Sequence, residues 1–267
     1  RDRAAYLALR NGKARLRSQT GLKDEFSRAA TRAKSYLPYM ERTFRKHGLP
    51  KDLTRMVFVE SMFNLQALSK VGASGIWQFM PRTGRLFLRV TRWLDERNSP
   101  LKATEAAAKL LSANYKELGT WPLAITAYNH GVGGMKRATQ NLATTDFSKI
   151  VAQYKSRTFG FASRNFYAEF LAAKAIFNRK FQHLVIGRST PESLSKITLN
   201  TRHSIKSLTS KTPLTEAKIR EHNPEINHKT LRRYRHNVLP RNYQLIIPTK
   251  YTKHLHKVIR PAHTRRL

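Results

Sequence analysis

Cysteine is absent from this sequence of 267 residues, and acidic residues are scarce. The missing thiols exclude disulfides, a cysteine nucleophile and a thiolate metal site, and they leave the cellular compartment open. No apolar run approaches the roughly 20 residues that a membrane-spanning helix needs. Because the sequence begins at Arg1 rather than at methionine, we expect an export signal or a membrane anchor upstream of it.

The scarcity of acids leaves a strongly basic chain, with 51 Lys and Arg against 16 Asp and Glu and a net charge of +35. Solubility alone requires far less charge. The excess predicts a polyanionic partner, which can be a nucleic acid, an anionic membrane surface or an acidic cell-wall polymer. Against a nucleic-acid-binding protein, the basic residues are spread along the whole chain and no standard nucleic-acid-binding motif is present.

Helical periodicity dominates the first two thirds of the chain, and few segments there alternate as a strand does. Residues 1–47 are predicted to form an N-terminal helical segment, which ends before the Gly-Leu-Pro sequence at 48–50. Residues 48–187 form the main predicted domain, with strong helices at 103–118 and 164–179. This part of the chain is therefore predicted to be mainly α.

The composition changes at the Ser-Thr-Pro sequence of 189–191, which predicts a linker. Short strands are predicted at 197–200 and 243–248, with two short helices between them. Residues 188–250 are therefore predicted to form a small α+β domain of β-α-α-β order. Residues 251–267 show no packing pattern, and they are predicted to form a basic tail.

Glu60 is the most informative residue of the sequence. Leu53, Val57 and Glu60 are spaced four and three apart, so they share one face of a predicted helix. The apolar neighbours place the carboxyl group in a partly desolvated position, which raises its pKa and suits it to general acid catalysis. The alternative from these residues alone is a structural glutamate that caps a helix or pairs with Arg55 or Arg82.

The sequence that follows this glutamate has a composition that suits carbohydrate binding. Glycines within 72–84 allow a close approach of the backbone. Trp77, Phe79 and Tyr128 offer flat rings, and Gln78 and Asn129 offer amide donors and acceptors. For the aromatic residues, a position in the hydrophobic core is the alternative.

Four ordered motifs carry a family resemblance: the Glu-Ser pair at Glu60, Ser69, Gly-Ala-Ser-Gly-Ile-Trp-Gln at 72–78 and Ala-Tyr-Asn at 127–129. Together they resemble the motifs of lytic murein transglycosylases, glycoside hydrolases that share the goose-type lysozyme fold. The Ile-Trp-Gln variant makes the chain similar to the membrane-bound type D. The resemblance covers roughly residues 35–185 and implies a mainly α, lysozyme-like catalytic domain.

The resemblance implies cleavage of the β-1,4 bond between N-acetylmuramic acid and N-acetylglucosamine in peptidoglycan. Glu60 would protonate the glycosidic oxygen and then act as base on the muramoyl 6-hydroxyl, which gives a 1,6-anhydro product. The substrate-binding residues implied in the same way are Ser69, Gln78, Phe79, Tyr128, Asn129 and Tyr167.

Lysozyme-type hydrolysis is the alternative reaction. Most glycosidases use two carboxyl groups that flank the bond. The next acids after Glu60 are Asp95, Glu96 and Glu105, which lie outside the motif region. A second carboxyl group is therefore not evident in the sequence, but the fold could supply one.

Two departures from the family pattern leave the preferred N-acetylation state of the glycan open. Ala-Tyr-Asn is followed by His130 and Gly131, where the family often has Ala-Gly. The last catalytic helix usually begins with a tyrosine, and here Phe166 stands in that place with Tyr167 after it. The loss of that hydroxyl puts one substrate contact in question.

The C-terminal domain resembles a degenerate LysM module, through Asn-Pro-Glu-Ile-Asn at 223–227 and Leu-Ile-Ile-Pro at 245–248. Such modules bind polymers that contain N-acetylglucosamine. The usual Gly-Asp-Thr is replaced by Thr-Arg-His at 201–203, so a spacer or a charge-based anchor is the alternative. The histidines of this region fit no familiar ligand spacing, and neither a metal nor another cofactor is expected.

The resemblance implies peptidoglycan glycan strands and the anionic cell-wall surface as partners, since peptide carboxylates would attract a cationic enzyme. It also implies a monomer exported to the bacterial periplasm or cell envelope, without nucleic acid as the main partner. A non-catalytic wall-binding protein on the same scaffold is a further hypothesis. The complete motif around Glu60 argues against it.

Overall fold

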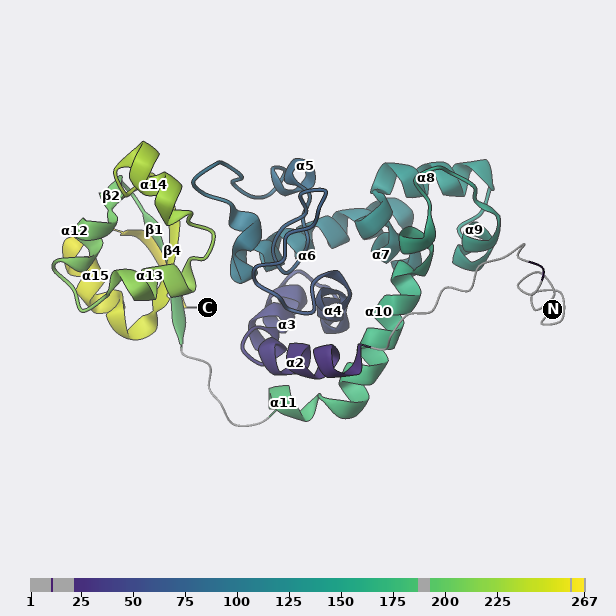
Figure 1. Cartoon of the computed structure of the whole chain (residues 1–267), viewed down its shortest axis with the longest axis horizontal. Helices are drawn as coiled ribbons and strands as arrows, with labels where there is room; N and C mark the ends of the chain where they lie inside the picture. Colours follow the sequence, from purple (N-terminus) through teal and green to yellow (C-terminus); the bar gives the residue numbers. More distant parts are fainter. Residues whose placement is uncertain (1–10, 12–21, 187–192, 260, 267) are drawn as a thin grey trace.

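The computed structural model describes residue 11 and residues 22–186, 193–259 and 261–266. The expected helix over the first part of 1–47 and the expected linker at 189–191 fall largely outside these residues. Within them, the chain forms a larger helical domain followed by a smaller domain that contains strands (Figure 1).

The helical domain confirms the prediction of a mainly α architecture. It also contains two 3₁₀ helices, at Lys51–Arg55 and Glu96–Asn98. The predicted helices at 103–118 and 164–179 are present as α6 and α10, each slightly longer than expected. The α-helices are α2 (Lys23–Ala33), α3 (Leu37–Lys46), α4 (Met56–Glu60), α5 (Pro81–Gly84), α6 (Pro100–Leu118), α7 (Trp121–His130), α8 (Val132–Asn141), α9 (Phe147–Gln153), α10 (Phe161–Lys180) and α11 (His183–Ile186).

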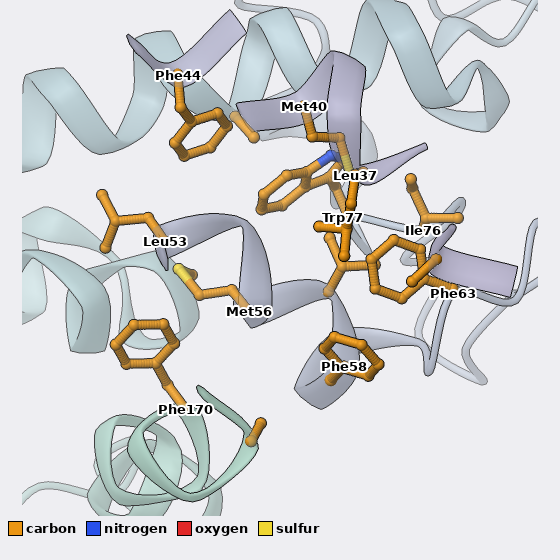
Figure 2. Packing of buried hydrophobic residues seen from close by; sticks show 14 of the residues in the cluster. Leu37, Met40, Phe44, Leu53, Met56, Phe58, Phe63, Ile76, Trp77 and Phe170 are labelled. Atoms are coloured by element: carbon orange, nitrogen blue, oxygen red, sulfur yellow. The ribbon is translucent and has the colours of Figure 1, made fainter. Parts of the chain in front are cut away.

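Helix α10 is a long helix of this domain, and both α4 and α7 pack against it. Its apolar stripe of Phe166, Phe170, Ala173 and Phe177 is buried, as the spacing predicts. Figure 2 shows Phe170 directed towards Met56 of α4 in the common core. The short helix α4 is therefore held between the core and α10.

The predicted boundary at residue 47 is not a domain boundary. Leu37, Met40 and Phe44 of α3 are fully buried in the same cluster as Trp77, and Phe44 stacks on that ring at 5.6 Å. Gly48 ends the turn after α3 with a φ of 70°. The glycine therefore changes the chain direction within one core, so α2 and α3 belong to the helical domain.

The C-terminal domain is built on a three-stranded antiparallel sheet of order β4-β1-β5. The two predicted strands are present as β1 and β4, which pair with each other, and the two predicted helices between them are present as α12 and α13. A third helix, α14, which was not predicted, also lies between these two strands. A short pair of strands, β2 with β3, and helix α15 add to the domain. The bounds are β1 (Leu194–Leu199), β2 (His203–Ser204), α12 (Ile205–Thr209), α13 (Glu216–His222), α14 (His228–Arg235), β3 (Val238–Leu239), β4 (Gln244–Pro248), the 3₁₀ helix Thr249–Tyr251, α15 (Thr252–Val258) and β5 (Pro261–Arg266).

The prediction of an unpacked basic tail at 251–267 is wrong. Helix α15 buries Leu255 in the core of the C-terminal domain, and Ile259 is also buried there. Strand β5 then pairs with the free edge of β1. Among so many basic residues, the two apolar residues Leu255 and Ile259 formed no visible pattern. Strand β5 depends on β1, which is more than 60 residues away in the sequence.

Replacing Phe177 with alanine is expected to lower the free energy of unfolding by about 3–5 kcal/mol, because it opens a cavity where α10 meets α4. Phe177 is fully buried, and its ring lies 5.2 Å from the ring of Phe58. Urea unfolding measures the change. The matched control is Ile176→Ala, since Ile176 precedes Phe177 and is 38% exposed. Equal losses in the two variants would contradict this packing.

Candidate active site

Glu60 is the last residue of α4. The helix stops there because Met62 and Phe63, two residues with bulky side chains, adopt left-handed backbone angles with φ of 50° and 57°. Asn64, which the spacing places on the same helical face, lies beyond this turn. The carboxyl group of Glu60 thus stands at a helix end rather than in the middle of a helix.

Long-range contacts hold this strained turn in place. The Ser61 hydroxyl donates to the carbonyl oxygen of Ile76 at 2.8 Å, and the Arg32 guanidinium donates to that of Met62 at 2.8 Å. The ring of Phe63 is fully buried against Phe58. Backbone strain of this kind costs free energy and persists only where the surrounding structure imposes it, which is frequent at functional sites.

The Glu60 side chain is half-buried, and it forms no ion pair or hydrogen bond with any of the described residues. Arg55, one alternative partner, pairs with Glu41 instead. Loss of solvation raises the pKa of Glu60 to about 8, and the negative charge of Glu169 adds to this shift. At neutral pH the group is therefore a protonated acid with access to solvent.

The glycine-rich segment forms a compact loop in which the side chains of Ser69 and Gln78 both form hydrogen bonds with the backbone. The Ala73 amide donates to the Ser69 hydroxyl oxygen at 2.9 Å. Gln78 has a φ of 48°, and its side-chain nitrogen donates to the Gly75 carbonyl oxygen at 2.8 Å. Its amide oxygen has no partner among the described residues. The loop therefore leaves one polar acceptor of Gln78 available to a ligand.

Tyr128 lies near the acid, as the motif resemblance implies. Its hydroxyl donates to the carbonyl oxygen of Trp77 at 2.8 Å. Burial and the charge of Glu60 raise the pKa of Tyr128 well above its usual range. Tyr128 thus connects α7 to the glycine-rich loop beside Glu60.

Phe79 does not present its ring to a ligand. The side chain is only 2% exposed, and its ring packs 5.9 Å from that of Tyr128. Phe79 is therefore a residue of the hydrophobic core, which was the alternative that the sequence left open. What Phe79 offers near the loop is its backbone.

Asn129 and Tyr167 occupy neighbouring elements. Asn129 is exposed, and its side-chain oxygen accepts a hydrogen bond from Ser163 at 2.8 Å, which ties α7 to the first turn of α10. Tyr167 is half-buried, and its ring contacts Phe147 and Phe170. His130 is a packing residue, because its ring lies edge-on against Phe159 at 5.0 Å and burial lowers its pKa.

Glu169 is the residue that the sequence analysis missed. It lies on α10, largely exposed, three residues after the buried Phe166. Helix α10 packs against α4, and the charge of Glu169 acts on Glu60. Most acids in the described part of the chain pair with a Lys, Arg or His, whereas no such pair involves Glu169. Acidic residues are rare in this basic chain, so a glutamate next to the apolar stripe of a predicted helix was the signal by which Glu169 could have been recognised.

Comparison with known proteins defines the class of this domain. Residues 39–151 match the family model described as "Transglycosylase SLT domain". The matched range includes α4, the glycine-rich loop and α7, which together carry Glu60, Gln78 and Tyr128. The helical domain is therefore similar to a transglycosylase SLT domain over residues 39–151.

Two named relatives are similar to this chain over part of their length. A protein of Alteromonas sp. (strain M-1) named for tributyltin chloride resistance is 36% identical over 115 residues, which is 42% of this chain and 56% of that protein. "Membrane-bound lytic murein transglycosylase D" of Escherichia coli (strain K12) is 36% identical over 109 residues, or 40% of this chain and 24% of that protein. The chain thus spans little more than half of one relative and a quarter of the other.

A solved structure shows a weaker likeness. The 70 kDa soluble lytic transglycosylase from Escherichia coli is 21% identical, with a TM-score of 0.44, and the match covers 58% of this chain and 26% of that chain.

Replacing Glu60 with glutamine is expected to stabilise the protein at about pH 8 but not at about pH 4. The unfolded chain loses this proton near the usual pKa of 4.5, whereas the folded chain keeps it until about pH 8. The unfolded state therefore binds fewer protons in this window, and wild-type stability falls as the pH rises through it. Melting temperatures of both proteins at the two pH values measure the effect.

The control for this comparison is Glu117→Gln. Glu117 is exposed, and the Lys136 ammonium group lowers its pKa. Its replacement should not stabilise the protein at the higher pH. A Glu60→Gln gain that is the same at both pH values would contradict a raised pKa.

Replacing Glu169 with glutamine is expected to lower the pKa of Glu60 below its value of about 8. The substitution removes a negative charge that disfavours ionisation of the neighbouring carboxyl group. Carbon-13 NMR of the carboxyl groups, titrated between pH 4 and pH 10, reads this pKa directly, and Glu117→Gln again serves as the control. An unchanged titration of Glu60 would mean that burial alone sets its pKa.

Proposed function

We propose that this protein cleaves the β-1,4 bond between N-acetylmuramic acid and N-acetylglucosamine in peptidoglycan by lytic transglycosylation. One observation carries the proposal: within an SLT domain, Glu60 is half-buried, unpaired among the described residues and protonated up to about pH 8. A carboxylic acid in that state is what departure of a sugar oxygen requires. The relative named membrane-bound lytic murein transglycosylase D supports the same reaction class.

The proposed reaction uses Glu60 twice. Its proton passes to the glycosidic oxygen as the bond from that oxygen to the muramoyl C1 breaks. The resulting carboxylate then takes the proton of the muramoyl 6-hydroxyl, whose oxygen forms the new bond to C1. The product is a 1,6-anhydromuramoyl end, no water is consumed, and Glu60 is protonated again.

Hydrolysis of the same bond is the second candidate, and Glu169 is the observation that favours it. A second carboxyl group beside the general acid is the usual arrangement in glycosidases that use water. Glu169 reaches the site from α10 and is largely exposed. In this variant it would take a proton from the attacking water, and the product would carry a reducing end.

The remaining site residues are proposed as ligands of the glycan. The free amide oxygen of Gln78 and the exposed amide of Asn129 suit sugar hydroxyl and acetamido groups. Ser69 and Tyr128 are proposed as further contacts of the glycan, and their hydrogen bonds with Ala73 and Trp77 hold the glycine-rich loop. Tyr167 would line a more distant part of the site. These same contacts would determine which N-acetylation state of the glycan the site prefers.

The charge and the second domain fit a wall-bound enzyme. A net charge of +35 would attract the protein to the anionic cell wall, in the bacterial periplasm or cell envelope. The LysM-like domain would add contacts to glycan strands, and the enzyme would act as a monomer. No helix in the part of the chain that the structure describes is long and apolar enough to cross a membrane.

Glu60→Gln is expected to reduce release of soluble muropeptides from purified peptidoglycan by at least about 10²-fold, because glutamine cannot donate or accept the proton. The glutamine keeps the size of the side chain, so a folded variant is expected. Unchanged release would rule out Glu60 as the acid, whereas no release even from the wild-type protein would favour a wall-binding protein.

Mass spectrometry of the wild-type products separates the two reactions. Anhydro-muropeptides are the expected product, while reducing muramoyl ends would identify hydrolysis. The same measurement on Glu169→Gln is the matched test of the second candidate. If the wild-type protein gives reducing ends, their loss in Glu169→Gln would place Glu169 in a hydrolytic reaction.

A further inference from the structure

The C-terminal domain is joined to the helical domain by a contact surface, in addition to the chain that links them. The loop 89–99, which precedes α6, lies against it, and Leu94 is 1% exposed within the hydrophobic core of the C-terminal domain. The Asp95 amide donates to the carbonyl oxygen of Glu225 at 2.9 Å, and the Asn227 amide donates to that of Trp93 at 3.0 Å. The two domains therefore share part of one core.

A buried cation lies at the centre of this contact. Lys102, at the start of α6, is 5% exposed, and its ammonium nitrogen lies 2.5 Å from a carboxylate oxygen of Glu225. Glu96 lies 3.1 Å from the same nitrogen, and the ring of Tyr243 lies 4.1 Å away. A buried charge that loses its partners is strongly destabilising, so the position of this loop depends on the C-terminal domain.

The opposite side of the same loop supports the candidate active site. Arg97 is buried and donates to the carbonyl oxygens of Gly72 at 2.7 Å and Phe79 at 2.9 Å. The side-chain oxygen of Asn98 accepts a hydrogen bond from Ser74 at 2.6 Å. Residues 95–98 therefore lie between the C-terminal domain and the glycine-rich loop that carries Gln78.

Close packing leaves little room for slippage between these layers. A Cβ atom on Gly75 would stand 1.9 Å from the carbonyl oxygen of Arg97, and one on Gly84 would stand 2.9 Å from the Arg97 side chain. Well-packed interiors transmit a displacement because they have no voids in which to absorb it. A shift of residues 95–98, next to Lys102, would thus reach the backbone beside Gln78.

We propose that the C-terminal domain is a positioning element of the active site, which acts through Lys102 and Glu225 on residues 95–98 and through them on the loop that carries Gln78. This role differs from that of a glycan-binding module carried on a flexible linker. Only its kinetic consequence rests on the proposed function. The structural consequence holds whatever the reaction is.

The test uses the full chain with Glu225→Gln, which removes the charge and keeps the shape, and with Lys102→Met. Hydrogen exchange of residues 72–79 is expected to become faster in both variants. On peptidoglycan, kcat is expected to fall by about 10-fold with KM changed less than about twofold, because Gln78 is displaced relative to Glu60. Lys102→Arg keeps the buried charge and should recover most of the exchange protection and of kcat.

The matched control is Leu208→Ala, which weakens the core of the C-terminal domain on helix α12 without removing any group that forms the hydrogen bonds or ion pairs with the loop. Below its melting temperature this variant should keep the wild-type kcat and the wild-type exchange at 72–79. Unchanged exchange at 72–79 in Glu225→Gln would overturn the proposal, as would an equal kcat loss in Leu208→Ala. If the wild-type protein releases no muropeptides, the proposed function fails while the exchange measurement still decides this inference.

Discussion

The desolvated carboxyl group of Glu60 is the constraint on which the arrangement of the site depends. A carboxylic acid surrounded by protein and left without a cation holds its proton to about pH 8. This state costs stability, and it persists because α4 is fixed between the core and α10. The strained turn at Met62 and Phe63 then ends the helix so that the acid keeps access to solvent. Stability is thus given up at the place where a protonated acid is useful.

Charge acts in two opposite ways in this molecule. Over the chain as a whole, the excess of Lys and Arg would draw the protein to an anionic polymer. Near Glu60 the described residues supply no cation, and the charge that acts on the group is the carboxylate of Glu169. A lysine or arginine in that position would favour ionisation and remove the acid at neutral pH. The local absence of positive charge in so basic a chain is therefore as informative as the acid itself.

Much of the fold followed from local sequence patterns. The spacing of Phe166, Phe170 and Phe177 predicted α10 and its buried face, and the short apolar segments at 197–200 and 243–248 predicted β1 and β4. The prediction of an unpacked tail at 251–267 was wrong for two reasons. The buried residues Leu255 and Ile259 are too few to form a recognisable pattern, and β5 forms a strand by pairing with the distant β1. Phe79 shows a similar limit, because an aromatic ring beside a motif is equally suited to a sugar or to a core.

The sequence by itself determined the candidate acid, the order of the motifs and the class of domain, since each rests on residues close together in the chain. Only the tertiary structure decided that Glu60 has no counter-ion among the described residues, that Glu169 acts on it from another helix, and that Lys102 pairs with Glu225 of the C-terminal domain. The physical reason is that solvation and Coulomb energies depend on distances in space. Helix packing and the shared core set those distances, and no spacing along the chain encodes them.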